Sequence, residues 1–205
     1  MGLYTKYVLP RLLDLAMRNQ EIARLRAEWI PRARGGVLEV GIGSGLNLAF
    51  YSSEVHYVLG VDPSRELLAL AHNRIRLAPF KIDLLLQSAE HALPLTDGSI
   101  DTAVVTWTLC CMTDPLQALL EMNRVLKPEG HLIFVEHGRA PDSNVAIWQD
   151  RITPLWKHVA GGCTLNRKMD QLITTAGFQV AELATEYTRG PRAMTYTFQG
   201  VALRT

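Results

Sequence analysis

Apolar and polar positions alternate in blocks along this chain. Apolar runs rich in valine, leucine and isoleucine predict strands, and the stretches between them carry the 3.6-residue apolar stripe of helices. Strands that alternate with helices are typical of an α/β fold, with a parallel sheet covered by helices on both faces. We expect strands near 36–41, 56–62, 82–87, 100–106 and 130–136, and helices near 5–29, 46–53, 64–77, 114–126 and 166–176.

The C-terminal part of the chain has a different pattern. Two strand-like runs, Phe178 to Thr188 and Ala193 to Leu203, are separated only by Arg189-Gly190-Pro191. This connection is too short for a crossover helix, so the two runs are expected to form an antiparallel hairpin. No internal repeat or low-complexity linker interrupts the 205 residues, which predicts a single domain.

The turn after the first predicted strand is rich in glycine and reads EVGIGSGLN over residues 39–47. A dinucleotide fingerprint, G-x-G-x-x-G, needs a glycine where Leu46 stands, which argues against a dehydrogenase. Glu39 is expected near the ligand end of the strand. Its carboxylate would repel a pyrophosphate but suits a ligand with an ammonium group, which points to S-adenosylmethionine.

Further candidate ligand contacts follow the next strands, because ligands of such sheets bind beyond the carboxyl ends of the strands. Asp62 comes 21 residues after Gly41, where a carboxylate can accept hydrogen bonds from both ribose hydroxyls. The alternative is that Asp62 caps the helix that begins near Pro63. Backbone groups of Ser88-Ala89-Glu90 can meet the adenine edge, and Thr106-Trp107 are expected beside the transferred methyl group.

Composition and charge narrow the possible environments. The formal net charge of +1 argues against a general nucleic-acid surface. Three cysteines make no disulfide framework, and we recognise neither a signal peptide nor an apolar run of the roughly 20 residues that span a bilayer, so a cytoplasmic protein is expected. Residues 1–36 carry seven basic and three acidic side chains, which predicts either a solvated helix face or contact with an anionic membrane surface.

Several motifs together resemble a known family. LEVGIGSGLN, GVDPS, SAE, DGSIDTAVVTWTLC and RVLKPEGHLIFVEHG match, in order and spacing, class I S-adenosylmethionine-dependent methyltransferases of the small-molecule branch that includes the ubiquinone/menaquinone C-methyltransferases. NLAFY, TLCC, EHG, WQDRITPLW and GGCTLNR look like the alkyl-thiol methyltransferases in particular. The resemblance covers roughly residues 36–200. The chain departs from the family pattern at Ile42, Ser44 and Glu129, and a charged helix stands where the animal thiol enzymes have a membrane anchor.

The resemblance implies a Rossmann-like domain with a mostly parallel seven-stranded sheet and a C-terminal antiparallel hairpin. Residues 1–30 would form a lid helix carrying Tyr4 and Tyr7, although these tyrosines can equally serve helix packing. Residues 36–137 would form the cofactor-binding core, and residues 138–205 would supply the acceptor pocket and the hairpin. The residues implied for binding S-adenosylmethionine are Tyr4, Glu39, Gly41, Ile42, Gly43, Gly45, Asn47, Asp62, Pro63, Ser88, Ala89, Glu90, Thr106 and Trp107.

Candidate catalytic groups stand at the end of the fifth predicted strand. We expect His137 to receive or steer the proton of the acceptor and Glu136 to orient the imidazole. A thiol, with a pKa of about 8.5, already supplies some thiolate at neutral pH, so a thiol methyltransferase needs no strong base. Side chains that an apolar acceptor would need as walls are Met112, Trp148, Trp156, Cys163, Leu165 and Asn166, although tryptophans are also common core residues.

The expected function is methylation of a small thiol or sulfide. One alternative is methylation of a quinone, phenol or lipid-like acceptor on carbon, oxygen or nitrogen. Another is a non-catalytic module that binds S-adenosylmethionine. Cys110, Cys111 and Cys163 raise the idea of a soft-metal or arsenic site, but buried apolar cysteine is the favoured interpretation, and no metal is expected. The sequence does not determine the oligomeric state.

Overall fold

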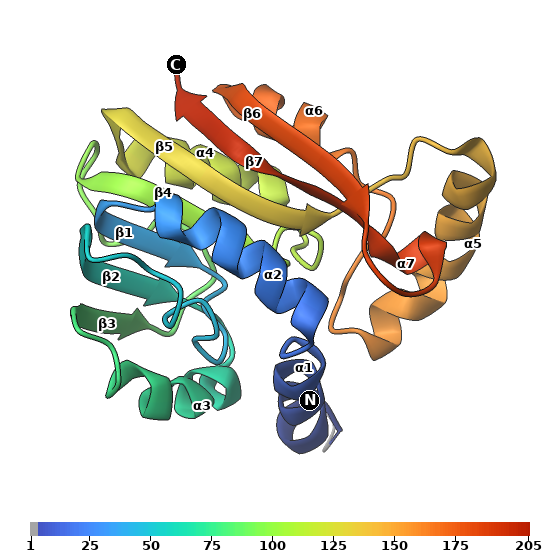
Figure 1. The fold of residues 1–205 in the computed structure, drawn as a ribbon, viewed down its shortest axis with the longest axis horizontal. Helices are drawn as coiled ribbons and strands as arrows, with labels where there is room; N and C mark the ends of the chain where they lie inside the picture. The colour runs from blue at the N-terminus through green and yellow to red at the C-terminus, as the bar shows by residue number, and fades with distance from the viewer. Residues whose placement is uncertain (1–3) are drawn as a thin grey trace.

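A single seven-stranded sheet runs through residues 4–205, the part of the chain that the computed structural model describes (Figure 1). Its order is β3-β2-β1-β4-β5-β7-β6. Strands β1 to β5 are parallel, and β7 is antiparallel to both β5 and β6, so the predicted mostly parallel sheet and C-terminal hairpin are confirmed. The strands are β1 (Gly35–Val40), β2 (Val55–Val61), β3 (Lys81–Leu85), β4 (Ile100–Thr106), β5 (Leu126–His137), β6 (Phe178–Tyr187) and β7 (Tyr196–Arg204).

Helices cover both faces of the sheet, as the alternating pattern predicts. Side chains of α2 and α3, such as Trp29 and Leu68, pack with Val58 and Val104 on one face. Residues of α4 and α6 pack on the other face. The helical segments are η1 (Tyr4–Val8, a π-helix), α1 (Leu9–Ala16), α2 (Gln20–Trp29), η2 (Ile30–Arg32), α3 (Arg65–Ile75), α4 (Pro115–Val125), α5 (Ser143–Val159), α6 (Met169–Thr175) and α7 (Arg192–Thr195).

The continuous N-terminal helix predicted over 5–29 is wrong. The chain breaks between Ala16 and Gln20, where Asn19 adopts an extended conformation and its side chain accepts a hydrogen bond from the Ile22 N–H at 3.0 Å. Asparagine at an N-cap starts a new helix because its side-chain oxygen satisfies a backbone donor of the first turn. The break lets α2 pack along the sheet while α1 turns away from it, as Figure 1 shows.

The helix predicted over 46–53 is also wrong. Residues 43–50 form successive tight turns, with the Gly45 N–H donating to Ile42 O at 2.9 Å and the Phe50 N–H to Asn47 O at 2.8 Å. Gly43 and Gly45 have φ angles of 54° and 77°, outside the range of a right-handed helix, so the chain reaches residue 46 from a turn. The glycine turn is therefore longer than the sequence pattern predicts.

The segment after β5 contains a helix that was not predicted from the sequence. Residues 143–159 form α5 despite Pro154 in the helix and the several tryptophans, and a loop follows it. By contrast, the predicted start of α4 is confirmed, because Asp114 accepts a hydrogen bond from the Gln117 N–H at 3.2 Å ahead of Pro115. Among the helices of residues 4–205, none is both long and apolar enough to cross a bilayer.

Candidate active site

A cavity of about 850 Å³ opens at the carboxyl ends of β1, β2 and β4. Helix α1 closes one side of it with Leu9, Leu13 and Asp14. Its volume lies in the range of about 300–1,000 Å³ that is usual for small-molecule sites. The sequence-predicted residues that line this first cavity are Glu39, Gly41, Ile42, Gly43, Asn47, Asp62, Pro63, Ser88, Ala89, Glu90, Thr106, Trp107 and Met112.

The three glycines of the turn have different surroundings. A Cβ on Gly41 (φ 74°) would lie 2.0 Å from Thr108 Oγ1, so the backbone at Gly41 packs directly against the start of the loop after β4. A Cβ on Gly43 (φ 54°) would meet no atom closer than 3.9 Å and would project into the cavity. Gly45 does not line the cavity, and its Cβ would press on Leu48 at 2.9 Å. Gly43 therefore keeps this side of the first cavity open, while Gly41 and Gly45 allow close packing of the backbone.

A buried polar network holds Glu39 at the bottom of the cavity. Asn47 Nδ2 donates to Glu39 Oε1 at 2.9 Å, and the Tyr51 hydroxyl donates to Oε2 at 2.8 Å. Arg26 Nε donates to Asn47 Oδ1 at 2.8 Å, which fixes the orientation of the amide. Burial raises the pKa of Glu39 to about 7. The sequence reading missed Arg26 and Tyr51, because neither belongs to the glycine motif and both reach Glu39 only through the fold.

Asp62 accepts hydrogen bonds from the backbone of two turns, one after β1 and one after β2. Its Oδ1 accepts from the Ser64 N–H at 2.7 Å, and its Oδ2 accepts from the Gly43 N–H at 3.0 Å. Burial raises the pKa of Asp62. The cap of α3 is Ser64, whose side chain accepts from the Leu67 N–H at 3.2 Å, so the alternative interpretation of Asp62 as the helix cap is wrong. The predicted ribose contact remains a prediction, with the carboxylate placed in the cavity wall.

A second feature missed in the sequence is the attachment of α1 to the glycine turn. The Ser44 hydroxyl donates to Asp14 Oδ1 at 2.6 Å, Arg74 of α3 lies 3.1 Å from the same oxygen, and Arg18 pairs with Oδ2. Burial raises the pKa of Asp14, but the hydrogen bonds from Ser44 and Arg18 outweigh it, and the net pKa is below its ordinary value. The signal available in the sequence was an acidic residue among the leucines of this helix.

We expect Asp14→Ala to loosen α1. The substitution removes the acceptor of Ser44 and leaves Arg74 without this partner, at a cost of about 2 kcal/mol for opening the segment. Trypsin should then cleave the native protein at Arg11 or Arg18 at least about tenfold faster. The matched control is Glu28→Ala, because Glu28 also pairs with an arginine, 3.4 Å away, but on the exposed face of α2. Equal cleavage rates in the two variants would contradict a tethering role for Asp14.

Trp107 separates the first cavity from a second one. Its φ of 48° is unusual for a residue other than glycine, and its N–H donates to Val135 O at 2.8 Å. The Arg26 guanidinium lies 4.9 Å from the centre of the indole ring. Trp107 lines both cavities, so the two cavities share this side chain as a wall.

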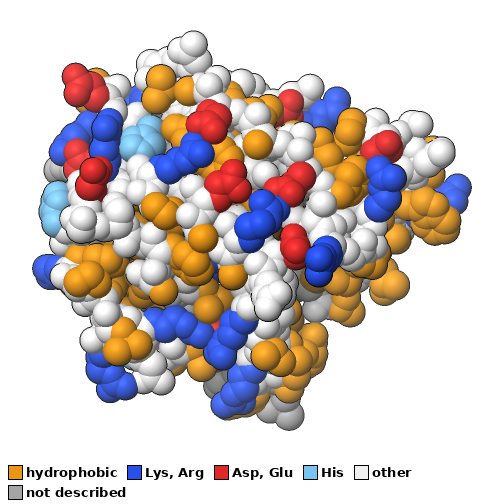
Figure 2. Space-filling model, viewed as in Figure 1, with side chains coloured by type: hydrophobic (Ala, Val, Ile, Leu, Met, Phe, Trp, Pro, Cys, Tyr) orange, Lys and Arg blue, Asp and Glu red, His pale blue; other side chains and the backbone are white. Residues whose placement is uncertain are grey.

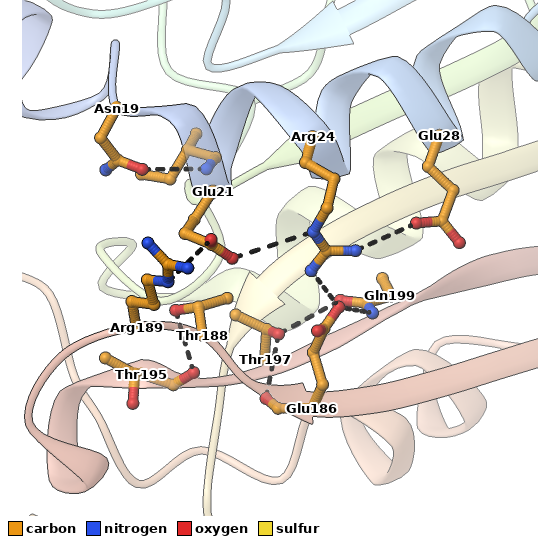
Figure 3. Close-up of polar contacts among 11 residues, drawn as sticks. Asn19, Glu21, Arg24, Glu28, Glu186, Thr188, Arg189, Thr195, Thr197 and Gln199 are labelled. Carbon is orange, nitrogen blue, oxygen red and sulfur yellow. Dashed lines mark hydrogen bonds and ion pairs between the residues drawn. The ribbon is translucent and has the colours of Figure 1, made fainter.

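The second cavity has a volume of about 660 Å³ and lies between α2 and the β6–β7 hairpin. Figure 3 shows how these elements are joined: Arg24 pairs with Glu186 at 2.7 Å, and Glu21 pairs with Arg189 at 3.5 Å. Thr197 Oγ1 donates to Glu186 O at 3.2 Å in the same region. The lining consists of Asn19, Gln20, Glu21, Ile22, Leu25, Trp107, His137, Thr188, Arg189, Met194, Thr195 and Thr197.

Glu136 and His137 have different surroundings although they are adjacent. Glu136 is fully buried, and its carboxylate accepts from the N–H groups of Thr108, Leu109 and Cys110 at 2.6, 2.9 and 3.2 Å. It lines neither cavity, and burial raises its pKa to about 7. His137 lines the second cavity. Glu136 therefore fixes the backbone of the turn after β4. Of the two residues, only His137 can contact a molecule bound in a cavity.

The two buried glutamates, Glu39 and Glu136, predict a pH dependence of stability. In the folded protein Glu39 and Glu136 have pKa values of about 7, above their ordinary value of 4.5. Between these values the folded state holds protons that the unfolded chain has released, so the free energy of unfolding should fall as the pH rises from 4.5 to 7 and then level off. Each carboxyl contributes a slope of up to about 1.4 kcal/mol per pH unit. Urea unfolding at several pH values measures this pH dependence, and Glu39→Gln should make it smaller. An unchanged slope in Glu39→Gln would contradict a raised pKa of Glu39.

The predicted acceptor and lid residues lie in varied places. Met112 lines the first cavity, whereas Trp148, Trp156, Cys163, Leu165 and Asn166 are not part of either lining. Trp148 is 56% exposed, with Arg151 stacked on its ring. Trp156 packs against the core, and Asn166 donates to Asp150 at 2.8 Å. The Tyr4 hydroxyl donates to Val159 O at 3.2 Å and joins η1 to the end of α5 rather than to the cavity.

The strand order, the glycine turn and the acidic residues at the ends of β1 and β2 together define the Rossmann-like fold of class I methyltransferases. Residues 38–134 match the family model described as a methyltransferase domain.

The chain is similar to several known methyltransferases. It is 35% identical over 154 residues to thiol S-methyltransferase TMT1B of Rattus norvegicus, covering 72% of this chain and 61% of that protein. It is 31% identical over 133 residues to the ubiquinone/menaquinone biosynthesis C-methyltransferase UbiE of Geotalea uraniireducens, covering 62% of this chain and 56% of UbiE. The chain thus spans about three fifths of the length of these relatives.

A solved structure shares the fold over most of the chain. The 1,6-didemethyltoxoflavin-N1-methyltransferase of Burkholderia thailandensis, determined with bound 1,6-didemethyltoxoflavin and S-adenosylhomocysteine, has a TM-score of 0.71 at 13% identity. The match covers 96% of this chain and 84% of that one. At this identity the comparison supports the fold alone, and the chemistry must be argued from the residues of the site.

Proposed function

We propose that this protein transfers a methyl group from S-adenosylmethionine to a small thiol or sulfide. The observation that carries the proposal is the pair of cavities separated by Trp107. One cavity has the glycine turn and the buried carboxylates of Glu39 and Asp62, and the other has the His137 imidazole in its wall. The similarity to a thiol S-methyltransferase adds support for sulfur as the acceptor atom.

The residues of the first cavity fit S-adenosylmethionine. Only a glycine at position 43 leaves the cradle open, because a Cβ there would occupy the cavity. Glu39 can balance the charge of an ammonium group, Asp62 can accept hydrogen bonds from ribose hydroxyls, and Ser88 to Glu90 can border the adenine. When bound, S-adenosylmethionine supplies an electrophilic methyl carbon on a positively charged sulfur.

The second cavity suits an acceptor that needs little acid–base help. Glu21 and Arg189 in its wall pair with each other, and His137 is the group placed to take up a proton. A thiol reacts as its thiolate, and the buried position of Trp107 limits water where the charges of the thiolate and of the sulfonium would cancel. His137 would therefore receive the thiol proton, with Glu136 fixing the neighbouring backbone rather than acting on the acceptor.

The deciding experiment is turnover with methyl-labelled S-adenosylmethionine. Sulfide, a small alkyl thiol, an aromatic thiol and a quinol are offered side by side between pH 6 and 9. We expect label in the sulfur products, at a rate that rises with the thiolate fraction. His137→Ala should lower the rate about tenfold or more at pH 6.5 while leaving the affinity for S-adenosylhomocysteine within about twofold. Label in the quinol alone would refute thiol methylation and favour the UbiE-like alternative, and binding without any turnover would favour a regulatory module.

We further propose that this protein works in a reducing compartment such as the cytoplasm, at or near an anionic membrane. The three unpaired cysteines support the compartment. Exposed apolar side chains support the membrane contact, because Leu15 of α1 is 66% exposed and Leu155 of α5 is 73% exposed. Figure 2 shows hydrophobic side chains gathered in the areas of these two helices, with Lys and Arg side chains beside them. Co-sedimentation with anionic but not with neutral liposomes would support the contact, and absence from both pellets would refute it.

A further inference from the structure

The three cysteines of this chain converge on one point in the fold. Cys110 Sγ lies 3.6 Å from Cys111 Sγ and 3.6 Å from Cys163 Sγ, and all three sulfur atoms lie within 4.8 Å of one another. None of them forms a disulfide. The sequence contains only these three cysteines, so the whole thiol content of the protein is in this cluster.

The convergence of two adjacent cysteines needs a special backbone, because neighbouring side chains on a regular strand point to opposite faces. Here β4 ends at Thr106, and the following residues form a turn in which the Cys111 N–H donates to Thr108 O at 2.9 Å. The Glu136 carboxylate fixes this turn by accepting three of its N–H groups. Both thiols are thereby turned toward the same partner.

The third thiol is brought in from a distant segment by equally firm contacts. The Thr164 N–H donates to Cys110 O at 2.7 Å, and the Thr164 hydroxyl donates to the same oxygen at 2.8 Å. Gly162, with a φ of 94°, lets this loop approach the backbone of Cys111, because a Cβ there would lie 2.9 Å from Cys111 O. The cluster is therefore arranged by the backbone before any ion binds.

The spacing and the chemistry of the cluster match those of a thiolate site. Three thiolates around a tetrahedral ion with metal–sulfur bonds of about 2.3 Å lie about 3.8 Å apart, close to the two measured separations of 3.6 Å. Cys111 also lines the first cavity, which provides a path for an ion to enter.

We propose that Cys110, Cys111 and Cys163 form a binding site for one soft, thiophilic metal ion of the zinc group. The ion joins the turn after β4 to the loop after α5, and these two segments form part of the wall of the first cavity through Cys111 and Gly161. Cys163 Sγ also lies 3.9 Å from His137 Nδ1, so the cluster borders the proposed acceptor site. The test below measures metal binding and not turnover, so its failure would leave the proposed function untouched.

The test uses Cd²⁺ as the probe, because its bonds to thiolates absorb in the ultraviolet by charge transfer. The fully reduced wild-type protein is titrated without air, in a reductant that carries no thiol. We expect one Cd²⁺ per chain, absorption that corresponds to three thiolates, and a higher unfolding temperature of the Cd²⁺-bound protein. Binding should weaken as the pH falls, because the ion must displace thiol protons.

The informative variant is Cys111→Ser, since Cys111 is the least buried of the three cysteines and its replacement disturbs the packing least. We expect its Cd²⁺ affinity to fall at least about 100-fold. The matched control is Met112→Leu, which removes a neighbouring thioether of similar volume and should bind Cd²⁺ like the wild type. Two results would overturn the proposal. One is a wild-type protein that shows no charge-transfer absorption when Cd²⁺ is added, and the other is a folded Cys111→Ser protein that binds Cd²⁺ as tightly as the wild type.

Discussion

Replacing Gly41 by alanine should lower the free energy of unfolding by about 3 kcal/mol. The backbone of Gly41 has a φ of 74°, and an L-residue in that region costs about 1–2 kcal/mol. The added Cβ would also lie 2.0 Å from Thr108 Oγ1 and 2.7 Å from its Cβ, so the loop after β4 must move. Such overpacking adds about 1–3 kcal/mol.

Gly43→Ala is the matched variant, because it carries the same conformational penalty without the clash. Its Cβ would meet no atom closer than 3.9 Å, so stability should fall by only about 1 kcal/mol. The methyl group would instead occupy the first cavity, and the affinity for S-adenosylhomocysteine should fall at least about tenfold. Urea unfolding and calorimetric titration measure the two effects. Equal stability losses at the two positions would mean that the contact between Gly41 and Thr108 is not tight.

Asp62→Ala should produce the largest loss of cofactor affinity, about 30-fold for S-adenosylhomocysteine. The substitution removes the proposed acceptor of the ribose hydroxyls, and a hydrogen bond to a charged group is worth about 2 kcal/mol. It also leaves the N–H groups of Gly43 and Ser64 without their partner, so the glycine turn loses its support.

The control for Asp62 is Glu66→Ala, because Glu66 is an acidic residue in the wall of the same cavity. We expect its effect on affinity to stay below about threefold, as for a partly exposed charge. Calorimetric titration with S-adenosylhomocysteine compares the two variants, and melting temperatures confirm that both are folded. An Asp62→Ala affinity equal to that of the wild type would remove Asp62 from the cofactor site.

The fold could be predicted largely from local patterns. The strand positions and the hairpin follow from apolar runs and short connections, and α4 begins where the predicted helix near 114–126 places it. The errors have two sources, namely a local capping contact that the apolar pattern does not reveal and side-chain contacts that the local pattern does not contain. Asn19 breaks the N-terminal helix by capping α2, and Asn47 is held by Glu39 and Arg26 in a turn that was expected to be helical.

Some residues of the candidate site could be predicted from the sequence, and others could not. Residues next to the strand ends, such as Glu39 and Asp62, were found from spacing alone and do line the first cavity. The acceptor residues proposed from the aromatic segment do not share a cavity, because α5 turns Trp148 to the surface. Conversely, the hairpin residues Arg189 and Thr197 border the second cavity, which no motif indicated.

The amino-acid sequence alone therefore determined the α/β class, the position of the glycine turn and the acidic residues after β1 and β2. These features depend on neighbours within a few positions, where hydrophobic period, glycine conformation and strand ends are local properties. The tertiary structure decided the tether of Asp14 to Ser44 and Arg74, the two cavities that meet at Trp107, and the convergence of the three thiols. Each of these joins segments that are distant in the chain, and only the packing of helices on the sheet brings them within contact distance.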